Sequence, residues 1–136
     1  MWWNDLDYDI IKYLYDIDKP TLGICLGMQL MGKTFGGHAI KKVNNHRISK
    51  DICHKIKINK NSILFKILNK EEIMVNSLHS FAISNTSLDI SAYSSDGIIE
   101  AVESKNRKFF LGIQWHPELL DYEYSKKIFN YFINCL

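Results

Sequence analysis

The sequence is poor in the features that mark secreted and metal-dependent domains. Its three cysteines, Cys25, Cys53 and Cys135, are an odd number and lie far apart, and they form neither a C-x-x-C pair nor a zinc-binding spacing. A disulfide framework is therefore not expected, and we predict a reducing compartment with no metal and no cofactor.

Long apolar runs and a strong charge imbalance are lacking as well. No stretch of about 18 apolar residues is present, and Met1 to Asp7 has neither the basic nor the apolar region of a signal peptide. The net charge of +2 is too small to indicate nucleic-acid binding. The densest basic stretch, Lys41 to Lys60, interleaves lysine with Asn, Ile and His, as exposed strands or a hairpin would. These absences predict a cytoplasmic protein without a membrane or nucleic-acid partner.

What remains is typical of one globular domain over residues 1–136, with 46% hydrophobic and 24% charged residues. Apolar residues recur at helical spacing from Leu6 to Ile17, and Pro20 ends that helix. Further elements are expected as a strand at 21–24, a helix that stops at Gly36-Gly37, strands at 52–58, 73–75, 89–93, 98–103 and 109–114, and a helix at 123–136. Apolar strands that alternate with helices predict an α/β fold with a mainly parallel, doubly wound sheet, and a site beyond the carboxyl ends of its strands.

A cysteine lies between two glycines where the first expected strand turns into a helix. The stretch G-I-C-L-G-M-Q (23–29) places Cys25 at this turn, where a side chain at Gly23 or Gly27 would collide with the following helix or block the substrate. The helix N-terminus favours a thiolate, so we expect a lowered pKa for Cys25. This pattern is typical of a nucleophile elbow, although buried structural cysteines are common.

A second motif, G-I-Q-W-H-P-E (112–118), follows the last expected strand. It supplies His116 as a base at the strand end and Glu118 as the carboxylate that fixes the tautomer of its imidazole. A cysteine thiol needs such a base at neutral pH. The two motifs together therefore predict cysteine-dependent acyl transfer with Cys25, His116 and Glu118 as the catalytic residues.

These two motifs resemble those of the class I glutamine amidotransferases, which hydrolyse the side-chain amide of glutamine. A third stretch, V-N-S-L-H-S (75–80) followed by S-S-D-G-I-I-E-A-V (94–102), is similar to the γ-glutamyl-γ-aminobutyrate hydrolase branch, the peptidase C26 type. The resemblance runs from about Leu6 to the C-terminus. It implies the flavodoxin-like fold of that family and attack of the Cys25 thiolate on a γ-glutamyl carbonyl, through a thioester.

The resemblance also implies roles for further residues. The backbone N–H of Leu26, which follows the nucleophile, would donate to the oxyanion. Gln29, Ser80 and Phe81 would contact the glutamyl part of a small-molecule substrate. If it has no such role, Gln29 is expected to be an ordinary residue on the helix surface. Asn76 and Ser77, in the third stretch, are in the same way expected to form only a turn. His79 either touches the substrate or shapes the loop, and for His38, His46 and His54 the sequence suggests no partner.

Family members have an additional N-terminal portion with strands of the same sheet and a glycine-rich loop that supplies a second oxyanion donor. Here nineteen residues precede Pro20, and the first glycine is Gly23. The strand at 21–24 is therefore expected to have one bare edge. We accordingly expect the chain to be nearly inactive alone, and to be poorly soluble or associated with a second copy or a complementing chain.

Three functions follow from the sequence. The first is a hydrolase of γ-glutamyl amides. The second is the glutaminase part of an amidotransferase that supplies ammonia to a synthase partner, since Leu26 and Met28 resemble that branch equally. The third is an inactive remnant or binding module that keeps the triad.

Overall fold

The computed structural model describes residues 5–36 and 40–136 as an α/β fold, which confirms the expected fold class. The chain forms α1 (Asp5–Asp16), β1 (Thr21–Ile24), α2 (Leu26–Thr34), β2 (Ile40–Lys42), β3 (Arg47–Ile58), α3 (Ile63–Leu68), β4 (Glu72–Leu78), β5 (Phe81–Ile83), β6 (Asp89–Ser94), β7 (Ile99–Glu103), β8 (Phe110–Ile113), a 3-10 helix (Pro117–Leu119) and α4 (Glu123–Asn134). The short elements α3 and β5 were not expected, whereas β2 and the first part of β3 lie in the basic stretch for which exposed strands or a hairpin were expected. None of the helices in the described ranges combines the length and apolar composition needed to cross a membrane.

Six strands form the main sheet in the order β1-β8-β7-β6-β3-β4, and β2 pairs with β5 in a separate ribbon. Only β1 and β8 pair in parallel within the described sheet, while its other four pairs are antiparallel. The prediction of a mainly parallel sheet was therefore wrong for this part of the chain. Short connections cause the difference, because a hairpin such as the one between β6 and β7 can only join antiparallel strands.

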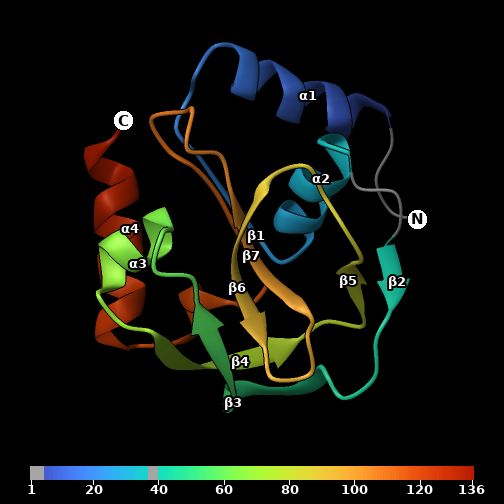
Figure 1. Ribbon diagram of the computed structural model, residues 1–136, viewed down its shortest axis with the longest axis vertical. Coiled ribbons are helices and arrows are strands. Elements are labelled where there is room, and N and C mark those ends of the chain that lie inside the picture. Colours follow the sequence, from blue (N-terminus) through green and yellow to red (C-terminus); the bar gives the residue numbers. More distant parts are fainter. Residues whose placement is uncertain (1–4, 37–39) are drawn as a thin grey trace.

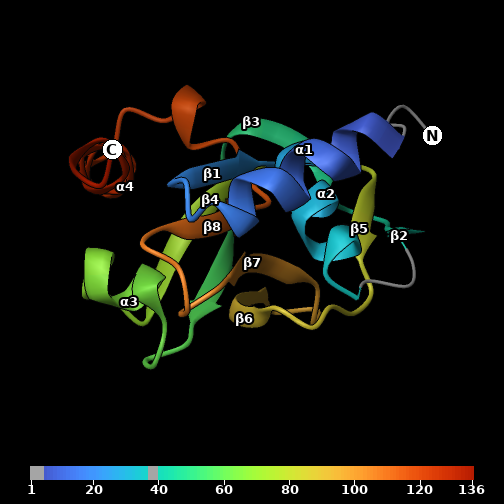
Figure 2. The ribbon, with the colours of Figure 1, turned by 90° about the horizontal axis from the view of Figure 1, so that it is seen from above.

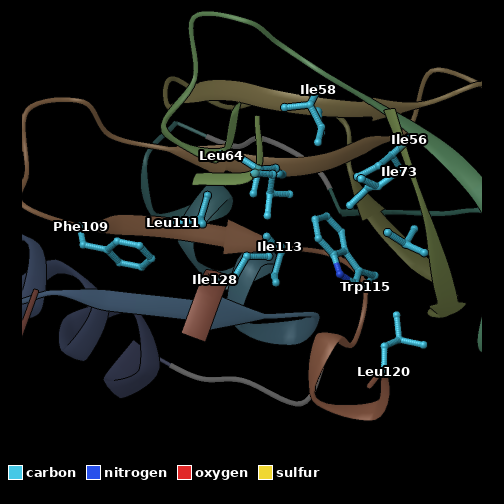
Figure 3. Packing of buried hydrophobic residues seen from close by; sticks show 14 residues of the cluster. Ile56, Ile58, Leu64, Ile73, Phe109, Leu111, Ile113, Trp115, Leu120 and Ile128 are labelled. Carbon is cyan, nitrogen blue, oxygen red and sulfur yellow. The ribbon is translucent and has the colours of Figure 1, made fainter. Parts of the chain in front are cut away.

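Helices cover both faces of the sheet, as expected for a doubly wound fold. Figure 2 shows α3 and α4 on one side of β1, β8, β7 and β6, and α2 on the other, with α1 next to α2. Leu64 of α3 and Ile128 of α4 are fully buried with Leu111 of β8 and Trp115, in the larger hydrophobic cluster (Figure 3). A smaller cluster under α2 contains Met28 and Val102.

Two glycines allow α2 to pack directly on the strands below it. A Cβ added to Gly23 of β1 would lie 2.8 Å from Met31 Sδ and 2.9 Å from the carbonyl carbon of Gly27. A Cβ added to Gly112 of β8 would lie 2.7 Å from Met28 Cγ. The predicted steric role of Gly23 is thus confirmed. At Gly27, by contrast, an added Cβ would meet nothing within 4 Å, so the helix does not require this glycine for packing.

The sheet is strongly curled. In Figure 1, β4 runs across the direction of β6 and β7. Although β4 and β8 are separated by three strands in the sheet order, Asn76 of β4 bonds the backbone of His116, just after β8. The curl therefore brings the far end of the sheet back to the carboxyl ends of β1 and β8.

Candidate active site

Cys25 lies at the junction of β1 and α2 in a strained backbone conformation. Its φ of 53° and ψ of −103° are unusual for a residue other than glycine. Its N–H donates to Ile113 O at 2.8 Å and its carbonyl accepts the N–H of Gln29 at 3.2 Å. The turn is thus anchored to β8 on one side and to α2 on the other, as the G-x-C-x-G pattern predicted.

The pKa of the Cys25 thiol differs from the expectation. Burial raises the pKa of Cys25 above its ordinary value, and the charges of Glu118 and Glu100 raise it further. The Leu26 N–H and the Gln114 amide lower this pKa without compensating for the burial. The predicted lowering of the pKa was therefore wrong. Attack by this sulfur requires that a base removes its proton.

A histidine–carboxylate pair follows β8. His116 Nδ1 lies 2.8 Å from Glu118 Oε2, and the side chain of His116 is partly exposed. Because the carboxylate accepts a hydrogen bond, it favours the tautomer with the proton on Nδ1, and Nε2 can then accept a proton from another group. The structure thus has the His-x-Glu pairing expected from the motif.

Parallel pairing of β1 and β8 brings the two motifs to one edge of the sheet. Ile24 is opposite Ile113 in the register, so Cys25 and Gln114 both leave the sheet at its carboxyl end. In the part of the chain that the structure describes, no hydrogen bond joins the Cys25 sulfur to His116; the sulfur accepts instead from Gln114 Nε2, at 3.5 Å. Catalytic hydrogen bonds are often long without substrate.

The backbone of His116 is held by a residue that the sequence indicated only as part of a turn. The fully buried Asn76 accepts from His116 N–H at 2.8 Å and donates through Nδ2 to His116 O at 2.9 Å. Nδ2 also donates to Lys50 O at 2.9 Å. Asn76 therefore fixes the main chain of the base in both directions.

A chain of side-chain amides connects Cys25 to the start of β5. Gln29 is only 4% exposed, which excludes its alternative interpretation as an ordinary surface residue. Its Nε2 lies 2.9 Å from Phe81 O and 3.3 Å from Gln114 Oε1, and Gln114 in turn donates to Cys25. Gln114 was missed from the sequence, where it is only the last residue of an expected strand.

A small cavity of about 160 Å³ lies beside Cys25. Its lining consists of Cys25, Leu26, Gln29, Arg47, Leu78, His79, Ser80 and Phe81. It thus includes the four residues that the resemblance assigned to oxyanion and substrate binding, together with the cationic Arg47. Larger hollows lie elsewhere, among them one of about 380 Å³ near Met74 and Tyr122, but no predicted catalytic residue lines them.

The remaining histidines are not scattered. His46, His54 and His79 lie close together, with ring centroids 5.3 Å apart for His46 and His54 and 4.8 Å apart for His46 and His79. Although burial favours the neutral acid, hydrogen bonds from Ser94 and His46 lower the pKa of Asp96 to about 2. His38 lies outside the described residues.

The chain is similar in sequence to a known protein family. The family model described as Peptidase C26 matches residues 4–118. Anthranilate synthase component 2 of Cyanophora paradoxa is 38% identical over 138 residues, which cover 98% of this chain and 69% of that protein. A glutamine-hydrolyzing GMP synthase subunit of Methanothrix thermoacetophila is 32% identical over 123 residues, which cover 90% and 65%.

A similar fold occurs in the crystal structure of a glutamine amidotransferase from Methylobacillus flagellatus. The TM-score is 0.73 at 19% identity, over 87% of this chain and 46% of that one. The chain spans about half to two thirds of the length of several relatives that it matches, and 24% of the length of two GMP synthases.

Proposed function

Because the chain belongs to the Peptidase C26 family of class I glutamine amidotransferase-like proteins, we propose that it cleaves a γ-glutamyl amide bond with Cys25 as nucleophile. One observation carries the proposal: a strained cysteine and a His–Glu pair leave the same edge of the sheet from the parallel strands β1 and β8. Substrates are glutamine or a γ-glutamyl-amine.

The raised pKa of Cys25 determines how the first step must proceed. His116 Nε2 takes the thiol proton as the sulfur attacks the γ-carbonyl, and the tetrahedral oxyanion accepts from the N–H of Leu26. His116 then gives the proton to the departing ammonia or amine, which leaves a thioester on Cys25. Water, deprotonated by His116, releases glutamate and restores the thiol. Glu118 stabilises the imidazolium in both steps.

The cavity next to Cys25 suits the glutamyl part of the substrate. Arg47 brings a positive charge to the cavity wall, which would pair with the α-carboxylate. Gln29, Ser80 and Phe81 form the rest of the subsite in this proposal. Since Gln29 Nε2 is already bonded to Phe81 O and to Gln114, its role is to keep the wall rigid.

A second function has its own support. Two of the relatives are named as parts of synthases, namely component 2 of anthranilate synthase and a subunit of a glutamine-hydrolyzing GMP synthase. The chain would then be the glutaminase part that supplies ammonia to a partner. An inactive remnant or binding module is the third alternative. In the described sheet β1 is an edge strand, which offers a position for a complementing chain or a second copy.

The reaction is tested with two substrates and two variants. Ammonia released from glutamine and amine released from a γ-glutamyl-amine are measured for the chain alone and with a candidate synthase. Covalent labelling by a glutamine-mimicking chloroketone, located by mass spectrometry, identifies the nucleophile where turnover is slow. The proposal expects label on Cys25, loss of labelling in His116→Ala and a smaller reduction in Glu118→Gln.

Four results would change the proposal. Label on Cys53 or Cys135 first, or unchanged labelling in His116→Ala, contradicts the mechanism. Glutamine-only activity that rises sharply with a synthase favours the glutaminase function. No label on any cysteine favours the inactive remnant.

A further inference from the structure

Behind the substrate cavity lies a buried carboxylate without a hydrogen bond. Glu100 of β7 is 0% exposed, and neither of its side-chain oxygens has a hydrogen-bond partner in the structure. Glu103, on the same strand and also buried, shows the contrast: it accepts the N–H of Ile63 at 2.8 Å and the hydroxyl of Ser91 at 2.5 Å. Burying an unpaired carboxylate is costly, so the surroundings of Glu100 must supply a compensating charge.

The groups around Glu100 are imidazoles. His46 Nδ1 and His79 Nε2 each lie 3.7 Å from Glu100 Oε2, too far for a hydrogen bond. One donor atom each from His46, His54 and Glu100 lie within 4.8 Å of one another. His54 Nε2 and His79 Nε2 are buried and have no hydrogen-bond partner. Nitrogen and oxygen donors thus converge on one point with nothing bonded between them.

The outer contacts of two histidines set their tautomers. His46 Nε2 lies 2.6 Å from Asp96 Oδ2, which favours a proton on Nε2 and a lone pair on Nδ1, the atom that faces Glu100. Nδ1 has one further contact, with Ser77 Oγ at 3.4 Å. His79 Nδ1 lies 2.8 Å from Phe81 O, which favours a lone pair on Nε2, again the atom that faces Glu100. Carboxylate and backbone-carbonyl partners of this kind are typical of histidines that bind metal ions.

From this arrangement we propose that His46, His54 and Glu100 bind a zinc ion, with the fourth position open and His79 next to Glu100 but outside this group of three donors. The chemistry of the donors fits, because imidazole and carboxylate are ordinary zinc ligands. The spacing fits as well: some point lies within about 2.8 Å of all three donor atoms, and shifts of about 0.7 Å would give the usual bond length of about 2.1 Å.

The sequence does not reveal this site. Its ligands, at positions 46, 54 and 100, have no metal-binding spacing, which is why no metal was expected. They meet because the turn directly before β3, β3 itself and β7 converge in the curled sheet. His46, His79 and Glu100 are nearly fully buried and His54 is partly exposed, so the ion would reach the site from the His54 side and serve a structural purpose.

The site has a consequence for the neighbouring nucleophile. Burial is the main cause of the raised pKa of Cys25, and the charge of Glu100 adds to it. A cation bound to Glu100 would oppose that contribution. His79 also connects the two sites directly, because it lines the cavity and its Nδ1 bonds the carbonyl of Phe81.

The experiment measures zinc itself. The purified chain is stripped with a chelator, dialysed against micromolar free Zn²⁺, and analysed for zinc per chain by mass spectrometry of the metal. We expect one zinc ion per chain, and a rise of about 10 °C in Tm at one hundred times Kd. Glu100→Gln and His54→Gln should each bind less than about a tenth as much zinc at the same free concentration.

Two controls separate this site from other zinc-binding groups. His116→Ala removes a histidine outside the cluster, and Cys53→Ser removes a nearby thiol, and both should still bind one zinc ion. If Glu100→Gln fails to fold by circular dichroism, His54→Gln, the partly exposed ligand, decides the matter. No zinc on the parent chain at micromolar free Zn²⁺, equal binding by His54→Gln, or loss of zinc in His116→Ala instead would each overturn the proposal.

Discussion

The two glycines that flank Cys25 should respond in opposite ways to the same substitution. In Gly23→Ala the new methyl group would lie 2.9 Å from the carbonyl carbon of Gly27 and 3.0 Å from its oxygen, and these backbone atoms cannot rotate away. Helix α2 must therefore lift from β1, and overpacking of this kind costs about 1–3 kcal/mol. In Gly27→Ala the methyl group enters open space, and replacing a helical glycine by alanine stabilises by up to about 1 kcal/mol.

The two variants should therefore differ by about 1–4 kcal/mol in the free energy of unfolding. Urea unfolding followed by circular dichroism measures this difference, and thermal unfolding should show it as about 4 °C in Tm for each kcal/mol. Each variant is the control of the other, because the chemical change is identical and the two positions are four residues apart. Equal stabilities, or a Gly27→Ala variant less stable than Gly23→Ala, would refute the packing argument.

Three further predictions concern the base, the thiol and the sheet edge. Asn76→Ala removes three hydrogen bonds and should lower the free energy of unfolding by about 3 kcal/mol, as measured by urea unfolding. The control, Asn130→Ala on the exposed face of α4, should change this free energy by less than about 0.5 kcal/mol. Similar values for both variants would contradict the hydrogen bonding at Asn76. Because the pKa of Cys25 is raised, less of this thiol than of a free thiol is present as thiolate at pH 7. Iodoacetamide should therefore react more slowly with Cys25 than with glutathione, and the reaction should become faster as the pH rises through and beyond 9. A faster reaction with Cys25 than with glutathione at pH 7 would show that the thiol is activated without substrate. Sedimentation velocity at increasing concentration should show association through the edge strand β1, and a monomer at every concentration would argue against an exposed pairing edge.

Local patterns were sufficient to predict the turn at Cys25 and the contact between His116 and Glu118. The strained turn at Cys25 needs only a short apolar strand, two small neighbours and a helix-forming sequence, all within ten residues. The pairing of His116 with Glu118 likewise depends on two residues of separation. Sequence reasoning works in these places because the chain itself enforces the proximity.

Contacts between distant segments could not be predicted in this way. Gln114 reaches Cys25 across 89 positions, and Asn76 reaches His116 across 40. Both depend on strand order and on the curl of the sheet, which no local pattern encodes. The direction of the strands could have been predicted in part. The turn at Ser95-Asp96-Gly97 implies that the two strands it joins are antiparallel, as the structure shows. The prediction of a mainly parallel sheet followed instead from the general rule for chains in which strands and helices alternate.

The hydrogen bonds between Asn76 and the backbone of His116 have a consequence for partial unfolding. Cys25 follows the strand at one end of the sheet order, while Asn76, which binds the backbone of His116, lies on β4 at the other end. Opening of either end, whether by fraying of β1 or by detachment of β4 from β3, would separate sulfur from imidazole before the remaining strands come apart. Under the proposed function, Cys25 and His116 would therefore act together only while both ends of the sheet are in place, and a half-unfolded molecule would have no activated thiol that could react with other amides.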